Sequence, residues 1–294
     1  MGFVYRYASW KVGVICSISF IFSFIFLFVM GMVTFLVPGK PVAGEVVAGV
    51  EADLVPYRAV YRLALDRADF QSGITGAEGE MVIEWPKECD GWSSSQSLTM
   101  GLNQSSGEYI EAETRYASWE SRDGVTMRFN IRNSHNGALS EHYSGVAKLK
   151  TPNGGGVAEY TVPEGLSIEL PEGTIFPTRH LLEMISSAKR GERILSRIVF
   201  DGATEEGMFE INAVIGSATK VKEQNIRLDP SLNLSYWPVR LAFFNFDLAQ
   251  DLPEYETSIH LVANGVSREL VLDFGDFVIR AVLDKFELLE KRSC

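Results

Sequence analysis

From residue 54 onward, the sequence alternates between apolar and polar side chains with a period of two, and turn residues break this alternation at short intervals. In residues 55–66, for example, Tyr61 and Leu63 fall on one face while Arg58 and Arg62 fall on the other. A period of two is typical of β-strands, because successive side chains of a strand point to opposite faces of its sheet. The pattern therefore favours an antiparallel sheet with one solvated face.

About a dozen such strands are expected, joined by short turns. Asp123-Gly124 and residues 153–156 (Asn-Gly-Gly-Gly) predict hairpins, and Asn264-Gly265 predicts a two-residue type I′ turn. Gly73, Gly76 and Gly79 are expected to form a turn before a strand at residues 80–85, and Pro238 is expected to mark a bend or a sheet edge. The expected strands cover residues 55–66, 80–85, 92–103, 109–121, 125–132, 142–149, 157–162, 194–200, 208–215, 257–263, 266–272 and 277–289, and residues 232–246 form an aromatic and apolar stretch.

Residues 173–202 interrupt the strands with one predicted helix. Apolar residues recur at Leu181, Ile185 and Ala188, the spacing of one helix face, with Leu182 beside them. The helix ends at Gly191, after basic residues that suit the negative end of the helix dipole. It is too short to be stable alone, so it must pack against the sheet. About seven strands precede it and five follow.

The entry to this helix is a candidate site. Its residues are Phe176, Pro177, Thr178 and His180. Pro177 and Thr178 suit the first turn and the cap, and Phe176 suits packing. His180 and Glu183 share a helix face, but a histidine in a first turn is more often a packing or capping group than a metal ligand.

The N-terminus carries an export signal. Residues 12–37 contain no charged side chain and follow Arg6 and Lys11. This is the order of a basic segment and an apolar core, and the run is long enough to span a bilayer. Removal as a signal peptide and retention as an inner-membrane anchor both fit. Residues 1–38 are thus a signal peptide or anchor, 39–53 a linker, and 54–294 a single exported β domain.

The exported part is acidic. Without residues 1–38, which hold two basic and no acidic residues, 25 basic residues face 38 acidic ones, for a formal charge of −13. Nucleic acid is therefore disfavoured as a partner. Contact with a membrane is expected only through the N-terminal segment.

Cys89 and Cys294 are the two cysteines outside the apolar run, which itself contains Cys16. In an exported chain, two cysteines most economically form one disulfide. Two free thiols, or a terminal thiol that pairs with another molecule, are the alternatives.

No catalytic motif, metal-ligand spacing or cofactor loop occurs in the sequence. Glu183 and Asp201 could serve a hydrolase of envelope polymers, but nothing in their spacing favours this over ordinary surface carboxylates. We therefore predict a non-enzymatic protein without a metal or cofactor. An apolar surplus suggests one alternative, a pocket for a lipid or other apolar ligand between helix and sheet. Its candidate residues are Tyr236, Trp237, Phe243, Phe244, Leu181 and Ile185.

Several short motifs occur in a specific order. They are residues 57–61 (Tyr-Arg-Ala-Val-Tyr), 72–76 (Ser-Gly-Ile-Thr-Gly), 89–92 (Cys-Asp-Gly-Trp), 176–180 (Phe-Pro-Thr-Arg-His), 190–192 (Arg-Gly-Glu), 199–202 (Val-Phe-Asp-Gly), 273–277 (Asp-Phe-Gly-Asp-Phe) and Cys294. In this order, over roughly residues 55–294, the sequence resembles the envelope integrity protein B family of exported alphaproteobacterial β proteins.

The resemblance implies a β-spiral: a long antiparallel sheet wound into an incomplete barrel, with one main helix packed against it. It also implies a periplasmic location, an internal disulfide between Cys89 and Cys294, no catalytic residue, and a role in maintaining the cell envelope under stress. The resemblance does not identify the binding partner, which we expect to be an envelope protein or a lipid.

Overall fold

Alternation of buried and exposed side chains builds the sheet. In β5 (Thr126–His135), for instance, Met127, Phe129 and Ile131 are buried while the residues between them face outward. The computed structural model describes residues 54–86, 88–205, 207–220, 232, 235–246 and 251–290. The sheet formed by these residues has fifteen strands. Besides β5 they are β1 (Tyr57–Ala68), β2 (Ile74–Trp85), β3 (Gly91–Gln104), β4 (Tyr109–Ser121), β6 (Ala138–Leu149), β7 (Gly156–Val162), β8 (Ser167–Leu170), β9 (Thr174–Ile175), β10 (Ile194–Phe200), β11 (Met208–Ile215), β12 (Tyr236–Asn245), β13 (Tyr255–Val262), β14 (Ser267–Asp273) and β15 (Phe277–Leu288).

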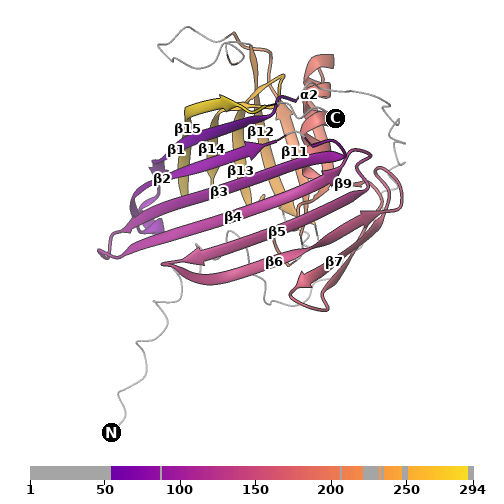
Figure 1. The fold of residues 1–294 in the computed structure, drawn as a ribbon. Helices are drawn as coiled ribbons and strands as arrows, with labels where there is room; N and C mark the ends of the chain where they lie inside the picture. The colour runs from indigo at the N-terminus through magenta and orange to yellow at the C-terminus, as the bar shows by residue number, and fades with distance from the viewer. Residues whose placement is uncertain are drawn as a thin grey trace, which may run out of the picture. The chain divides into compact units, whose positions relative to one another are not determined.

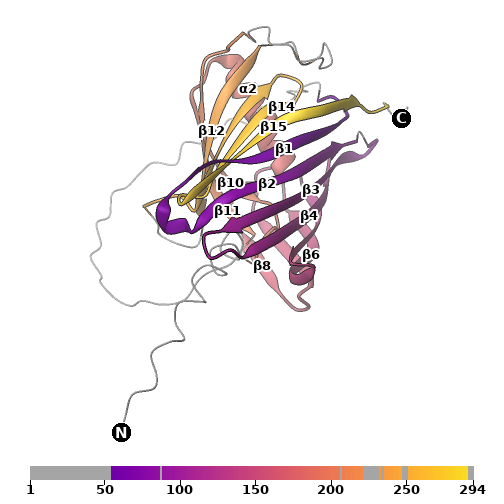
Figure 2. The ribbon, with the colours of Figure 1, turned by 90° about the vertical axis from the view of Figure 1, so that its left-hand side faces the viewer.

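The strand order brings the two ends of the described chain together. β1 pairs with β15, so the sheet runs from β8 back to β1, crosses to β15, and continues down to β9. Figure 2 shows β15 lying between β1 and β14. All neighbouring pairs are antiparallel except β9 with β10. The lateral edges are β8 and β9, which follow each other in sequence, and we call the gap between them the seam. The predicted fold class, a curled and incompletely closed antiparallel sheet with one main helix, is confirmed (Figure 1).

The helix α2 (Pro177–Arg190) follows the seam directly, and a short 3-10 turn, η1 (Phe70–Ser72), joins β1 to β2. Gly191 ends α2 in a left-handed conformation, φ 79°, as the sequence predicts. Its N–H donates to the carbonyl of Ala188 at 3.1 Å, and the N–H of Glu192 donates to that of Ser187 at 2.9 Å. These bonds satisfy carbonyls that a helix end otherwise leaves without partners.

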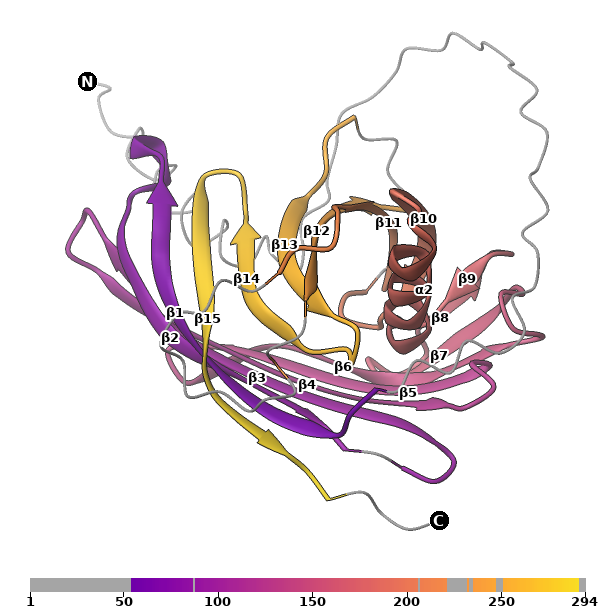
Figure 3. The ribbon, with the colours of Figure 1, turned by 90° about the horizontal axis from the view of Figure 1, so that it is seen from above.

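α2 lies inside the curve of the sheet, beside β10 and β11 (Figure 3). Ile185 and Ala188 pack there with apolar residues of β10 to β13, including Val199 and Ile211. A second buried cluster lies beneath β5 to β8 and contains Phe176, the residue before the helix. The helix therefore covers one cluster while its entry residue joins the other.

Two local predictions were wrong, one of the two interpretations of Pro238 is excluded, and the predicted number of strands was too low. Nine strands precede α2 and six follow it. Gly76 and Gly79 do not form a turn but lie within β2, where a Cβ on Gly79 would come within 2.2 Å of the Thr99 carbonyl oxygen. Glycine is needed there because the neighbouring backbone approaches closely.

The turn at Asn264-Gly265 is not type I′. That turn requires positive φ at both central residues, and here Gly265 has φ 90° while Asn264 is not among the positive-φ residues. The two-residue type I′ loop lies instead at Asn136-Gly137, with φ 49° and 77°, between β5 and β6.

Pro238 does not lie at a lateral edge, since β12 is flanked by β11 and β13. Val239 is the partner of Ile215, the last residue of β11, and Pro238 precedes Val239, so it lies just beyond the end of the β11–β12 pairing. There its missing N–H costs no ladder bond toward β11.

Candidate functional site

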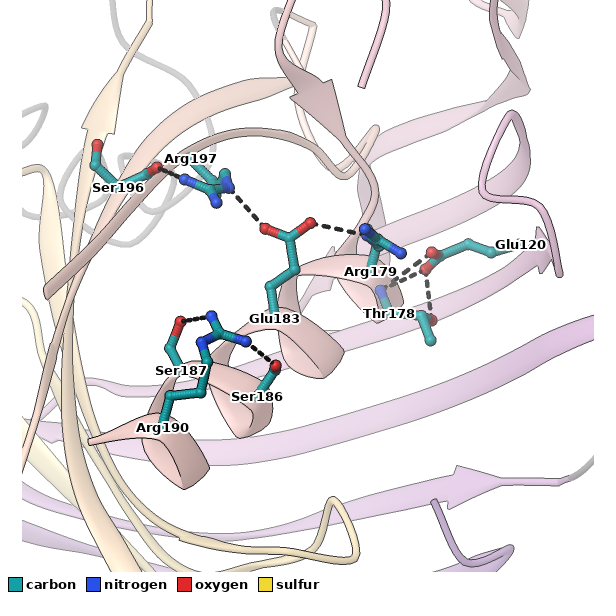
Figure 4. Close-up of polar contacts among 9 residues, drawn as sticks. All are labelled: Glu120, Thr178, Arg179, Glu183, Ser186, Ser187, Arg190, Ser196 and Arg197. Carbon is teal, nitrogen blue, oxygen red and sulfur yellow. Dashed lines mark hydrogen bonds and ion pairs between the residues drawn. The ribbon is translucent and has the colours of Figure 1, made fainter. Parts of the chain in front are cut away.

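A buried carboxylate on β4 contacts the start of α2. Glu120, on β4, has only 2% of its surface exposed. Its Oε1 and Oε2 accept hydrogen bonds from the backbone N–H of Thr178 at 2.8 and 3.1 Å, and Oε1 accepts a third from Thr178 Oγ1 at 2.7 Å (Figure 4). Phe176, at the N-cap, provides no side-chain bond. Glu120 therefore caps the helix from 58 residues away.

Burial controls the charge of this carboxyl group. Removal from water raises the pKa of Glu120 to about 7, although the bonds from Thr178 and the backbone N–H of Arg179 oppose that rise. The positive end of the helix dipole favours the anion as well. Glu120 thus changes charge near neutral pH.

A second carboxylate, on α2 itself, connects the helix to β10. Glu183 accepts from Arg179 Nε at 2.8 Å through Oε1 and from Arg197 Nε, on β10, at 2.7 Å through Oε2 (Figure 4). Its side chain is 15% exposed, so this bridge is better shielded than a surface ion pair. We call the Glu120–Thr178 and Glu183–Arg197 contacts together the helix clasp, because they tie α2 to β4 and to β10.

His180 lies in the first turn and is buried. Burial is the main cause that lowers the pKa of His180 to about 4, while Glu183 opposes and Arg197 reinforces the shift. The imidazole is therefore neutral at pH 7. Its Nε2 has no hydrogen-bond partner among the described residues.

The other helix-entry residues behave as the sequence indicates. Phe176 is fully buried and meets Phe200 edge to face, with ring centroids 6.5 Å apart. Pro177 opens the first turn. Thr178 contributes to the cap, but as a donor to Glu120. The entry is a packed junction rather than an open pocket.

The six residues predicted to line an apolar pocket divide between two faces. Leu181, Ile185, Trp237 and Phe243 belong to the cluster beneath α2. Tyr236 and Phe244 alternate with Trp237 and Phe243 along β12 and so point to the opposite face. The ring of Tyr236 lies there against that of His260, tilted by 32° with centroids 4.3 Å apart, and Phe244 lies opposite Glu210. A ligand pocket stays a prediction, restricted to the first four residues.

The carboxylates considered for hydrolysis have structural partners. Both oxygens of Glu183 are taken by arginines. Asp201, after β10, accepts from the backbone N–H of Ala203 at 2.8 Å, and burial raises its pKa to about 6. In the described ranges, no group of three His, Cys, Asp or Glu side chains could hold a metal ion.

Sequence reasoning missed Glu120, the residue that anchors the helix. One signal was available: Tyr116, Ser118 and Glu120 alternate on the inner face of β4, where an acidic residue is costly unless it is bonded. The sequence could not show which donor would meet it.

Comparison with known proteins defines the family. A model of the EipB-like family matches residues 48–290, which is most of the chain. The chain belongs to the EipB-like family. It is 30% identical over 252 residues to the cell envelope integrity protein EipB of Brucella abortus (strain 2308), covering 84% of this chain and 89% of that protein.

A solved structure is also similar. The crystal structure of a beta-barrel-like protein of domain of unknown function DUF1849, from Brucella abortus, matches with a TM-score of 0.75 and 29% identity. The match covers 81% of this chain and 99% of that one. The predicted family resemblance is thereby confirmed.

Two predictions shared with the EipB-like resemblance fall outside the described residues. Cys89 lies in the connection from β2 to β3, but Cys294 is not described, so their disulfide stays a prediction. The apolar run at residues 12–37 is not described either. Within the described part, no helix is long and apolar enough to cross a membrane.

Proposed function

We propose that this chain is a periplasmic protein that supports cell envelope integrity by binding another envelope component, without catalysing a reaction. The observation that carries the proposal is the 30% identity to cell envelope integrity protein EipB across 84% of this chain. The export signal at residues 12–37, after Arg6 and Lys11, supports delivery to the periplasm.

The geometry favours a binding role over catalysis. The carboxylates near α2 hold the fold together: Glu120 caps the helix and Glu183 bridges two arginines. A general acid or base needs a free position toward substrate, and these groups use their oxygens internally. A predicted disulfide between Cys89 and Cys294 fits a domain that must persist outside the cytoplasm.

Deletion of the gene tests the role directly. Cells that lack the protein should survive less well in detergent or a cell-wall antibiotic than the parent strain, and a plasmid copy should restore survival. Survival equal to the parent under both challenges would contradict the proposal. Crosslinking in living cells, followed by identification of the captured molecule, would then name the partner.

Binding of a lipid or other apolar ligand is a second candidate. Leu181, Leu182, Trp237 and Phe243 are only partly buried at the margin of the cluster beneath α2. Their remaining apolar surface could accept an acyl chain. Lipid extraction from purified protein, with native mass spectrometry, tests this. Ligand-free protein that takes up no fluorescent fatty acid would exclude it.

A further inference from the structure

The outer face of β4 to β6 gathers basic side chains that are scattered in the sequence. On β5, Arg128 and Arg132 are exposed while Met127, Phe129 and Ile131 are buried between them. Residues of neighbouring strands on the same outer face add to them. We call this set the arginine face; it consists of Arg115 of β4, Arg128 and Arg132 of β5, and His142 and Lys148 of β6.

The pairing register places like charges directly opposite each other. Arg115 is paired with Arg132, and Arg132 in turn with His142. Neighbouring strands are about 4.8 Å apart, and like charges directly opposite destabilise a sheet. The pKa of His142 is lowered first by burial and then by the charge of Arg132. Arg132 Nε donates to His142 Nε2 at 3.5 Å, so the repulsion within this row acts between Arg115 and Arg132.

Few carboxylates offset these charges. Arg115 pairs with Glu113 and Arg128 lies over the ring of Trp119 at 5.0 Å, but within the described residues neither Arg128, Arg132 nor Lys148 has an acidic partner. Arg268 of β14 donates to the carbonyl of Leu232, and the other strand arginines do have acidic partners. They are Arg58 with Glu84, Arg62 with Asp284, Arg67 with Asp273, Arg197 with Glu183, Arg240 with Glu256, and Arg280 with Asp66 and Glu269.

Uncharged hydrogen-bonding groups adjoin the arginine face, and carboxylates border it at Glu113, opposite Ser134, and at Glu159, opposite Val146. Asn130 lies between Arg128 and Arg132, opposite Ser144. On the adjoining strand β3, hydroxyl side chains follow one another along the same face; they are Ser93, Ser95, Ser97 and Thr99, opposite Trp119, Ala117, Arg115 and Glu113. Figure 1 shows β3 to β6 as neighbouring strands of one broad surface.

The charges form two groups along the strands. Arg128 and Arg132 are four residues apart, which corresponds to about 14 Å along an extended strand. The Arg115–Arg132–His142 row lies at one end, Arg128 and Lys148 lie toward the other, and polar residues lie between them. This spacing suits a chain that carries repeated negative groups better than it suits one small anion.

We propose that the arginine face binds an anionic saccharide chain, with its carboxylate or phosphate groups on the arginines and its hydroxyl groups on Asn130 and the β3 hydroxyls. Guanidinium groups match such oxyanions with two parallel hydrogen bonds. A lipid bilayer is a poorer fit, because the large exposed apolar side chains here, Leu139 and Val157, lie only at the margins of the arginine face.

This proposal deepens the envelope role by naming a class of partner, and it rests on that role only for the compartment. Binding in solution is measurable whether or not a deletion strain is sensitive. A deletion strain without a phenotype would therefore overturn the envelope role and leave the saccharide proposal standing or failing by its own test.

Titration calorimetry with an oligogalacturonate of about ten sugars tests the proposal, with a neutral dextran oligomer of equal length as the ligand control. The variant Arg128→Ser/Arg132→Ser removes two exposed charges. Lys189→Ser/Lys285→Ser removes two charges from exposed residues elsewhere and is the matched control. Arg128→Lys/Arg132→Lys keeps the charge but removes the planar guanidinium groups that donate two parallel hydrogen bonds.

We expect oligogalacturonate to bind and dextran not to bind. Affinity should fall about tenfold or more in the serine variant, since each 1.4 kcal/mol is a factor of ten, less in the lysine variant, and not in the control. Added salt should weaken binding. The proposal is overturned if the wild-type protein does not bind oligogalacturonate, or if the Lys189→Ser/Lys285→Ser control variant loses as much affinity as the serine variant. It is also overturned if phosphatidylglycerol vesicles or a DNA oligonucleotide bind more tightly than the saccharide. Should the serine variant fail to fold, unchanged affinity in the lysine variant would overturn the bidentate contact.

Discussion

The carboxylate of Glu120 on β4 accepts three hydrogen bonds from Thr178, at 2.7, 2.8 and 3.1 Å, and so caps a helix that follows it by 58 residues. The contact links the two sides of the seam, because β4 lies on the β8 side of the sheet whereas α2 packs beside β10 and β11. Together with the bridge from Glu183 to Arg197, it ties α2, the only described α-helix, to β4 and to β10.

Removal of the cap should be costly. Glu120→Ala leaves the Thr178 N–H and hydroxyl buried without an acceptor, so the free energy of unfolding should fall by about 1–3 kcal/mol. Urea denaturation measures this. Glu113→Ala, on the same strand, removes a partner of exposed Arg115 and should change stability by less than about 1 kcal/mol. Equal losses in both variants would contradict the capping role.

The stability of the protein should depend on the charge of Glu120. Its pKa is raised to about 7 in the folded protein, above the usual value of 4.5, so the folded state binds the proton more tightly. The stabilisation due to this proton is complete below pH 4.5 and is lost as the pH rises through 7. Between pH 6 and 8 the loss should be about 1.4 kcal/mol.

Glu120→Gln resembles the neutral acid and should lack this part of the pH dependence. Asp201 acts in the same direction at lower pH, since its pKa is raised to about 6. His180 acts in the opposite direction, because its lowered pKa of about 4 makes the fold less stable as the pH falls below 6.5. Unfolding curves at pH 6 and 8 for both proteins check the prediction. Parallel losses in wild type and Glu120→Gln would contradict it.

Gly79 should not tolerate a side chain. An alanine Cβ there would lie 2.2 Å from the Thr99 carbonyl oxygen and 2.9 Å from Met100 Cα, both backbone atoms. Gly79→Ala should therefore lower stability by about 1–3 kcal/mol. Gly76→Ala is the matched control, since its nearest contact is the side-chain Nδ2 of Asn103 at 3.2 Å, which can move. Thermal melts that rank Gly76→Ala as the more harmful change would refute this explanation.

Local pattern predicted much of the fold. Alternation located most strands, and the apolar spacing with Gly191 defined α2, because both signals lie within a few residues. Predictions from local sequence were wrong where a residue is required by a contact with a distant part of the chain. Gly76 and Gly79 suggested a turn, whereas Gly79 is required by the approach of β3, and Asn264-Gly265 suggested a turn type that Asn136-Gly137 adopts instead.

The site was harder to predict because its contacts join distant residues. Nothing near Glu120 in the sequence indicates that Thr178 will donate to it. The arginine face was likewise hidden, since Arg115, Arg132 and His142 become neighbours only through strand register.

The predicted disulfide can be tested by its effect on stability. Closure of a loop of about 200 residues would contribute roughly 5 kcal/mol in a chain-entropy model. Cys89→Ser, Cys294→Ser and the double variant should therefore melt at lower temperature by the same amount, with the fold retained. The thiol titration of unreduced wild-type protein should detect neither cysteine. Two titratable thiols, or a double variant less stable than either single one, would contradict the pairing.

Rescue of a deletion strain tests the central claim most directly. The strain would carry the full chain, or a chain without residues 1–38 that stays in the cytoplasm, and its survival in detergent would be measured against an empty vector. The account predicts that the full chain restores survival and that the cytoplasmic form, present in equal amount, does not. Equal rescue by both forms, or no rescue by an exported and folded full chain, would contradict it.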